Sequence, residues 1–132
     1  MAIGARARAP TIPAMLGLLL VDHGSRRAEA NAQLEDMAGR VARLRPDDLV
    51  GCCHMELAAP DIAAGFASLV ARGATRIVLL PYLLGDGRHL REDIPRLAGE
   101  AAARHPGVGL AFGTALGPHD ALARLLLERA CL

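Results

Sequence analysis

The stretch LGLLLVDHGS, residues 16–25, decides the fold, because an uninterrupted apolar run stops abruptly at an acid, a histidine and a glycine. A short run that is apolar at every position is typical of a strand buried on both faces, as in parallel sheets. The run RIVLL at 76–80 has the same character and is closed by Pro81. These two runs predict neighbouring parallel strands with polar residues directly after them.

Strands and helices alternate along the rest of the chain. Two further strands are predicted over 49–55 and 108–112, and apolar residues recur at helical spacing over 27–44, 61–72, 90–104 and 119–131. Four successive βα units predict an α/β fold of the flavodoxin-like kind: an open, parallel, four-stranded sheet in the order 2-1-3-4, with helices on both faces. Pro95 is expected in the first turn of the third helix, or at the start of a new one.

Length and composition exclude several classes of protein. We expect residues 1–14 to be a disordered extension, or to precede a true start at Met15, and 15–132 to form one domain. Fifteen basic and fourteen acidic residues, without long blocks of either sign, give no case for nucleic-acid binding. No apolar run approaches the roughly 20 residues that cross a bilayer. Three cysteines without a C-x-x-C pair indicate reduced thiols in a cytoplasmic protein.

Three metal-binding side chains are predicted to meet at the carboxyl edge of this sheet. His23 follows the first strand, Glu56 the second, and the loop after the third leads to His89. With the order 2-1-3-4, the switch point at which ligands bind lies between strands 1 and 3. Two imidazoles and a carboxylate suit divalent ions such as Co²⁺, Ni²⁺, Fe²⁺ and Zn²⁺.

The same crevice is expected to attract an acidic, flat ligand. Arginine side chains hold carboxylates in bidentate geometry, and three of them lie near the predicted edge: Arg26, Arg88 and Arg91. Glycines would let the backbone approach a flat ligand closely, and they stand at 24, 85 and 87. Their spacing is too common to indicate a phosphate-binding loop.

Three motifs carry a resemblance to a known family. HGSR occupies 23–26, Met55-Glu56 is followed by Pro60, and Gly87-x-His89 is followed by Asp-Ile-Pro at 93–95. In this order the segments resemble the small sirohydrochlorin chelatases, the CbiX/SirB family of class II chelatases, over residues 16–127. Leu83-Leu84 stands where many members have Phe-Leu, and Asp86 where relatives carry a third histidine, so the preferred metal is left open.

The resemblance implies an ATP-independent lyase that inserts Co²⁺, Fe²⁺ or Ni²⁺ into sirohydrochlorin or a related tetrapyrrole, in cobalamin or siroheme synthesis. The metal would be a substrate, no organic cofactor is expected, and short members are homodimers with one half-site per chain. His23 and His89 become metal ligands and proton acceptors, and Glu56 completes the coordination or takes the second proton. The implied substrate contacts are Ser25, Arg26, Leu84, Gly87, Arg88 and Arg91.

Other hypotheses use the same residues. A carrier of metal or tetrapyrrole would bind through these histidines without turnover, and a phosphoryl-transfer enzyme would use His23 as a nucleophile, although Asp22 beside it would repel phosphate. A purely structural alternative has Ser25 cap the first helix while His23 packs. His54 is either a further site residue or a packed core histidine, and the latter is favoured.

Overall fold

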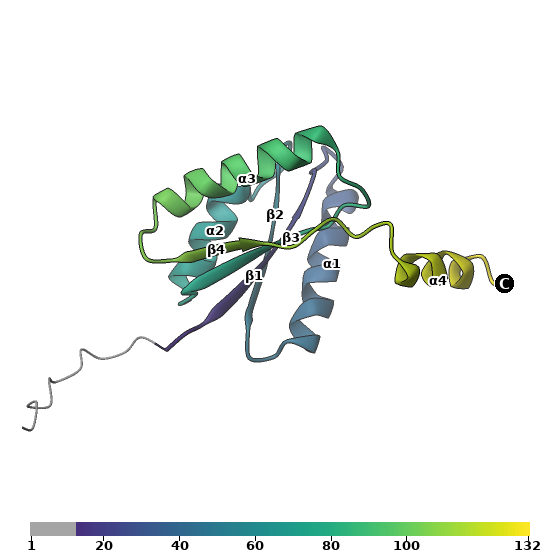
Figure 1. Cartoon of the computed structure of the whole chain (residues 1–132), viewed down its shortest axis with the longest axis horizontal. Coiled ribbons are helices and arrows are strands. Elements are labelled where there is room, and N and C mark those ends of the chain that lie inside the picture. Colours follow the sequence, from purple (N-terminus) through teal and green to yellow (C-terminus); the bar gives the residue numbers. More distant parts are fainter. Residues whose placement is uncertain (1–12) are drawn as a thin grey trace, which may run out of the picture.

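A computed structural model describes residues 13–132, and its elements alternate as predicted (Figure 1). The expected extension over 1–14 falls almost entirely outside the described residues. The elements are β1 (Leu16–Asp22), α1 (Ala28–Leu44), β2 (Leu49–His54), α2 (Ile62–Ala71), β3 (Arg76–Pro81), α3 (Arg88–Ala103), β4 (Gly109–Phe112) and α4 (Asp120–Arg129).

All four strands are parallel and lie in the order β2-β1-β3-β4, which confirms the predicted topology. The register pairs Asp22 with His54 on one side of β1, and Val21 with Pro81 on the other. The carboxyl ends of β1, β2 and β3 therefore lie side by side at one edge. This edge is where the predicted site residues begin.

One face of the sheet is closed by α2 and α3. Its core joins strand residues such as Leu19, Ile77 and Leu79 to Phe66 of α2 and Ala98 of α3, all of them fully buried. Asp61 begins α2 as predicted, since its carboxylate accepts a hydrogen bond of 2.8 Å from the Ala64 N–H. This face forms the larger core.

The opposite face carries α1 and a smaller core. Its buried members are Leu20 of β1 with Leu34 and Ala38 of α1. Val78 and Leu80 of β3 point to this face and stay half-exposed, whereas their neighbours Ile77 and Leu79 are fully buried on the other. Helix α1 therefore covers only the part of this face nearest β1 and β2.

Helix α3 begins at Arg88, two residues earlier than predicted, and Pro95 lies inside it rather than in its first turn. That expectation was wrong. Pro95 has no N–H to donate to the carbonyl of Arg91 one turn earlier. Arg91 is exposed, so water can satisfy that carbonyl, while Leu90, Ile94 and Ala98 hold the helix on the closed face.

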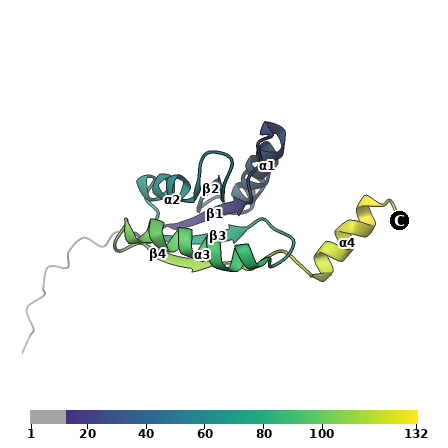
Figure 2. The ribbon, with the colours of Figure 1, turned by 90° about the horizontal axis from the view of Figure 1, so that it is seen from above.

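Helix α4 projects beyond the rest of the molecule in both views (Figures 1 and 2). None of its ten residues is buried. Over residues 13–132, no helix combines the length and the apolar character that crossing a bilayer requires.

Candidate functional site

Two of the predicted site residues meet because the β1–β2 pairing continues past the strand ends. The Met55 N–H donates to the Asp22 carbonyl at 2.9 Å, and the Glu56 N–H donates to the His23 carbonyl at 3.1 Å. His23 and Glu56 are therefore joined through the backbone, and both residues are exposed at the carboxyl edge. The two residues that carry the imidazole and the carboxylate are thus joined at one rim of the sheet.

Gly24 allows this close approach. Its φ of +87° lies in the left-handed region, and a Cβ at this position would stand 1.8 Å from the Glu56 carbonyl oxygen. No side chain fits there, because the obstacle is backbone that cannot rotate away. The glycine of the HGSR motif is therefore required by the contact that joins His23 to Glu56.

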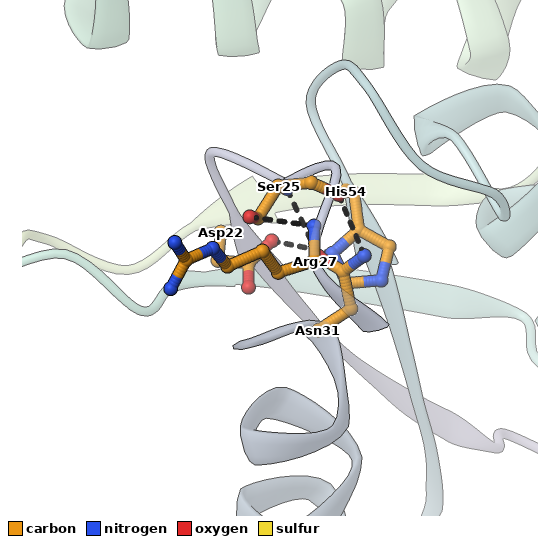
Figure 3. Close-up of polar contacts among 5 residues, drawn as sticks. All are labelled: Asp22, Ser25, Arg27, Asn31 and His54. Atoms are coloured by element: carbon orange, nitrogen blue, oxygen red, sulfur yellow. Dashed lines mark hydrogen bonds and ion pairs between the residues drawn. The ribbon is translucent and has the colours of Figure 1, made fainter. Parts of the chain in front are cut away.

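A contact between Asp22 and His54 lies at the ends of the two strands that lead to His23 and Glu56; Figure 3 shows this contact. Nδ1 of His54 lies 2.6 Å from Oδ1 of Asp22, and the His54 side chain is 2% exposed. This confirms the interpretation of His54 as a packed histidine. The sequence analysis did not foresee its partner, although the cross-strand register that follows from the order 2-1-3-4 places Asp22 opposite His54. The contact fixes the end of β1 from which His23 projects.

Asn31 of α1 holds the turn after His23 (Figure 3). Its side chain accepts from the Ser25 N–H at 2.9 Å and donates to the Ser25 carbonyl at 2.7 Å, while the Ser25 hydroxyl accepts from the Arg27 N–H at 3.0 Å. The N-cap of α1 is Arg27, and no side chain caps it. The structural alternative, in which Ser25 caps the helix and His23 packs, is therefore wrong on both counts.

His23 opens onto a cavity of about 280 Å³ at the switch point between β1 and β3. The cavity joins the turn after β1 to the residues after β3, and its lining includes His23, Ser25, Asn31, Tyr82 and Leu83. A ligand in this position would contact both halves of the sheet's carboxyl edge, as expected for an open parallel sheet.

The backbone places His89 in the first turn of α3, two residues after the N-cap Gly87, and not on a loop as expected. The helix starts early because the Leu90 and Arg91 N–H groups both donate to the Gly87 carbonyl, at 3.0 and 3.1 Å. The side chain of His89 is not among those described. The convergence of its ring with that of His23 stays a prediction.

The remaining candidates lie on exposed surface. Arg88 faces Glu92 at 3.6 Å, and Arg91 faces Asp86 at 3.6 Å. Arg91 and Asp86 line a second cavity of about 290 Å³, beside Phe112, rather than the one that His23 lines. Arg26 and Leu84 are exposed, and the Leu84 carbonyl accepts from the Gly117 N–H at 3.0 Å.

Among the side chains that the structure describes, no group of three or more His, Cys, Asp or Glu lies close enough to hold a metal ion. Cys53 is no free thiolate, because burial, followed by the nearby Cys52 and acidic groups, raises the pKa of its thiol. Burial also raises the pKa of Cys52. At the ends of β1 and β2, His23 and Glu56 combine exposure with ligand chemistry.

Comparisons with known proteins find relatives over most of the chain. A chloroplastic sirohydrochlorin ferrochelatase of Arabidopsis thaliana is 39% identical over 86% of this chain, and a sirohydrochlorin cobaltochelatase of Methanococcoides burtonii is 30% identical over 87%. The chain spans half the length of the plant protein and 94% of the archaeal one.

Solved structures give the same result for the fold. SirB of Bacillus subtilis subspecies spizizenii, in complex with cobalt, superposes with a TM-score of 0.78 at 28% identity, over 88% of this chain and 50% of that one. SirB of Bacillus subtilis with Fe³⁺ gives a TM-score of 0.81 at 28% identity, over 87% and 46%. The CbiX family model matches residues 17–131. The resemblance inferred from the three motifs is thereby confirmed, and the chain belongs to the CbiX family.

Proposed function

We propose that this chain inserts a divalent metal ion, Co²⁺, Fe²⁺ or Ni²⁺, into sirohydrochlorin or a related tetrapyrrole, as an ATP-independent step of cobalamin or siroheme synthesis. The observation that carries the proposal is the joining of His23 to Glu56 at the open carboxyl edge, in a chain whose relatives are named sirohydrochlorin ferrochelatases and cobaltochelatases. The metal is a substrate, and no organic cofactor takes part.

The chemistry requires a base and a ligand in the same place. Two pyrrole N–H groups lose protons while the ion exchanges water for ring nitrogens, and a neutral imidazole can either hold the ion or accept a proton. In the proposal, His23 and His89 hold the incoming ion, and Glu56 completes its coordination or takes the second proton. The hydrogen bond from the Glu56 N–H to the His23 carbonyl keeps the backbone of these two residues in a fixed relation while the ring is bound.

The tetrapyrrole is proposed to lie over the turn after β1 and the segment after β3. Its contacts would come from Ser25, Arg26, Leu84, Gly87, Arg88 and Arg91. The arginines would pair with the carboxylates of the tetrapyrrole rim, since both Arg88 and Arg91 are exposed and their present acidic partners lie as far as 3.6 Å away.

A single chain is proposed to supply half of the site. Short members of the family that the three motifs resemble are homodimers with one half-site per chain, so a second copy would face the same edge. We therefore propose a cytoplasmic homodimer, with each subunit contributing its own His23, Glu56 and His89.

The test follows the absorbance of sirohydrochlorin with Co²⁺, Ni²⁺ and Fe²⁺ separately. We expect wild-type protein to raise the rate of at least one insertion above the protein-free rate, and His89→Ala to abolish that increase while the circular dichroism spectrum is unchanged. Glu56→Gln tests the role of the carboxylate, and Asp36→Asn, which removes an exposed carboxylate from α1 instead, is its matched control. Tight binding of sirohydrochlorin and Co²⁺ without turnover would instead support a carrier.

A further inference from the structure

Leu57, the residue after Glu56, has a backbone conformation that leucine rarely adopts. Its φ of +68° lies in the left-handed region, where a Cβ crowds the backbone and where glycine or asparagine fits at a lower cost. Within residues 13–132, the other non-glycine residue with a positive φ is Cys131, one residue past the C-cap of α4. A left-handed residue is usual at a helix end, but Leu57 lies between β2 and α2. Its conformation therefore needs an explanation of its own.

Hydrogen bonds on both sides of Leu57 hold this conformation in place. Before it, the Glu56 N–H donates to the His23 carbonyl at 3.1 Å. After it, the Pro60 carbonyl accepts from the His54 N–H at 2.8 Å. The chain must therefore turn back between Glu56 and Pro60. Surroundings that fix both ends of a segment can sustain an unfavourable conformation at a residue between them.

The side chain of Leu57 has a second unfavourable property. It is 56% exposed and belongs to neither core. An exposed leucine alone needs no explanation, and Leu44 is exposed to a still greater extent. In Leu57, however, exposure to water coincides with a backbone cost that a polar asparagine would avoid. The stability of the free chain therefore does not account for a leucine here, whereas contact with an apolar ligand surface would.

The order of the strands places Leu57 near the predicted metal ligand. Strands β2, β1 and β3 are neighbours, and the segments after them carry Leu57, His23 and Leu84 respectively. Leu84 is 71% exposed, so exposed leucines follow the strands on both sides of the one that leads to His23. Three neighbouring strands span roughly 10 Å, which one flat macrocycle can cover. This order suits a ligand that combines a central metal-binding group with apolar faces.

We propose that Leu57 is a contact residue for the tetrapyrrole, and that its side chain packs on the apolar face of the macrocycle, on the other side of His23 from Leu84. The inference rests on the proposed function and adds an apolar contact to those assigned there. The strained backbone holds the leucine at the edge in the free chain, so little ordering is needed when the ring binds. Burial of the leucine on the ring contributes to the affinity for the ring, and not to the affinity for the metal ion.

The first test measures the binding of sirohydrochlorin without metal, by a titration followed by absorbance. Leu57→Asn keeps a residue that tolerates the left-handed conformation but removes the apolar side chain. We expect its dissociation constant to rise about tenfold, because a leucine side chain loses its burial on the ring. Leu57→Met should recover most of the lost affinity, since the two side chains differ little in volume. Leu44→Asn, which removes an exposed leucine from the end of α1, is the matched control and should bind as wild type does.

A second measurement separates a ligand contact from a structural role. If Leu57 served only to hold the loop, its replacement would lower the urea concentration at the midpoint of unfolding together with the affinity. We expect the midpoint of Leu57→Asn to equal or exceed that of wild type, because asparagine relieves the strain. The KM for sirohydrochlorin should rise while the KM for the metal is unchanged. An affinity equal to that of wild type would overturn the inference, and so would a lost affinity accompanied by a lower midpoint.

The outcomes also distinguish this inference from the proposed function. A wild-type protein that inserts metal, with a Leu57→Asn variant that binds sirohydrochlorin as tightly, would reject the contact alone. Binding that depends on Leu57 in a protein that inserts no metal would reject metal insertion alone and support a carrier. Loss of self-association in Leu57→Asn, with unchanged affinity for the ring, would assign the leucine to a contact between subunits instead. A wild-type protein that does not bind sirohydrochlorin would reject both.

Discussion

The two faces of the sheet differ in how fully helices cover them. On the closed face, two helices bury a continuous core that includes Phe66, Leu69 and Ala98. On the α1 face, the buried core consists of Leu20, Leu34 and Ala38, and an apolar groove lies beside it, between α1 and β3. The difference indicates that the closed face contributes most of the buried apolar surface that stabilises the fold. Both faces end at the carboxyl edge, where the candidate site lies.

The largest effect is expected on the closed face. Phe66 is fully buried, so Phe66→Ala removes its apolar contacts and leaves a cavity; the free energy of unfolding should fall by about 3–5 kcal/mol. Urea denaturation followed by circular dichroism measures this loss. A loss below about 1 kcal/mol would show that the closed face does not carry the stability assigned to it.

A smaller effect is expected where the two faces meet. His54→Ala removes the partner of Asp22 beneath the candidate site, and the free energy of unfolding should fall by about 2 kcal/mol. The metal-insertion rate should fall as well, because the end of β1 that carries His23 loses its anchor. His105→Ala, at the opposite edge of the sheet, is the control for insertion. Unchanged stability of the His54→Ala protein would show that the buried contact contributes nothing.

The pH dependence of stability should reveal the buried thiol of Cys53. Burial raises its pKa in the folded protein above the ordinary 9.0, so above pH 9 the unfolded chain releases a proton that the folded chain keeps. Unfolding is then favoured by up to about 1.4 kcal/mol per pH unit, whereas stability below pH 9 is unaffected by this group. Denaturation between pH 7 and 10 should show a shallower decline for Cys53→Ala than for wild type. Equal slopes would place the thiol in contact with water.

The smallest effect is expected in the groove. Met37→Ala should lower the free energy of unfolding by only about 1 kcal/mol, because its side chain is half-buried beside an open groove. Urea denaturation of the wild-type and Met37→Ala proteins measures the difference. A loss as large as that of Phe66→Ala would mean that the α1 face is as complete as the closed one.

Local patterns predicted most of the fold. The apolar runs at β1 and β3, and the Pro60-Asp61 start of α2, are signals carried by neighbouring residues, and the parallel sheet follows from the βα alternation. Pro95 led to the wrong start for α3. A proline in a helix interior costs about 3 kcal/mol, but the packing of this helix on the closed face outweighs that cost.

The position of two candidate residues was predictable, but the contacts that hold them were not. His23 and Glu56 could be placed at one edge, because both directly follow adjacent strands. Three supporting contacts depend on atomic separations that local sequence does not give. They are the contact of Asp22 with His54, the hydrogen bonds of Asn31 with Ser25, and the close approach of the Glu56 carbonyl to Gly24. The direction of α4 depends in the same way on hydrogen bonds from the segment before it to the segment after β3.

The most direct test of the account is the initial rate of Co²⁺ insertion into sirohydrochlorin by the His23→Ala protein. Loss of a positioned ligand and base predicts a rate at least about 100-fold below that of wild type, with the fold preserved, since His23 is exposed. A rate equal to that of wild type would contradict the assignment of the carboxyl edge as the site of metal insertion.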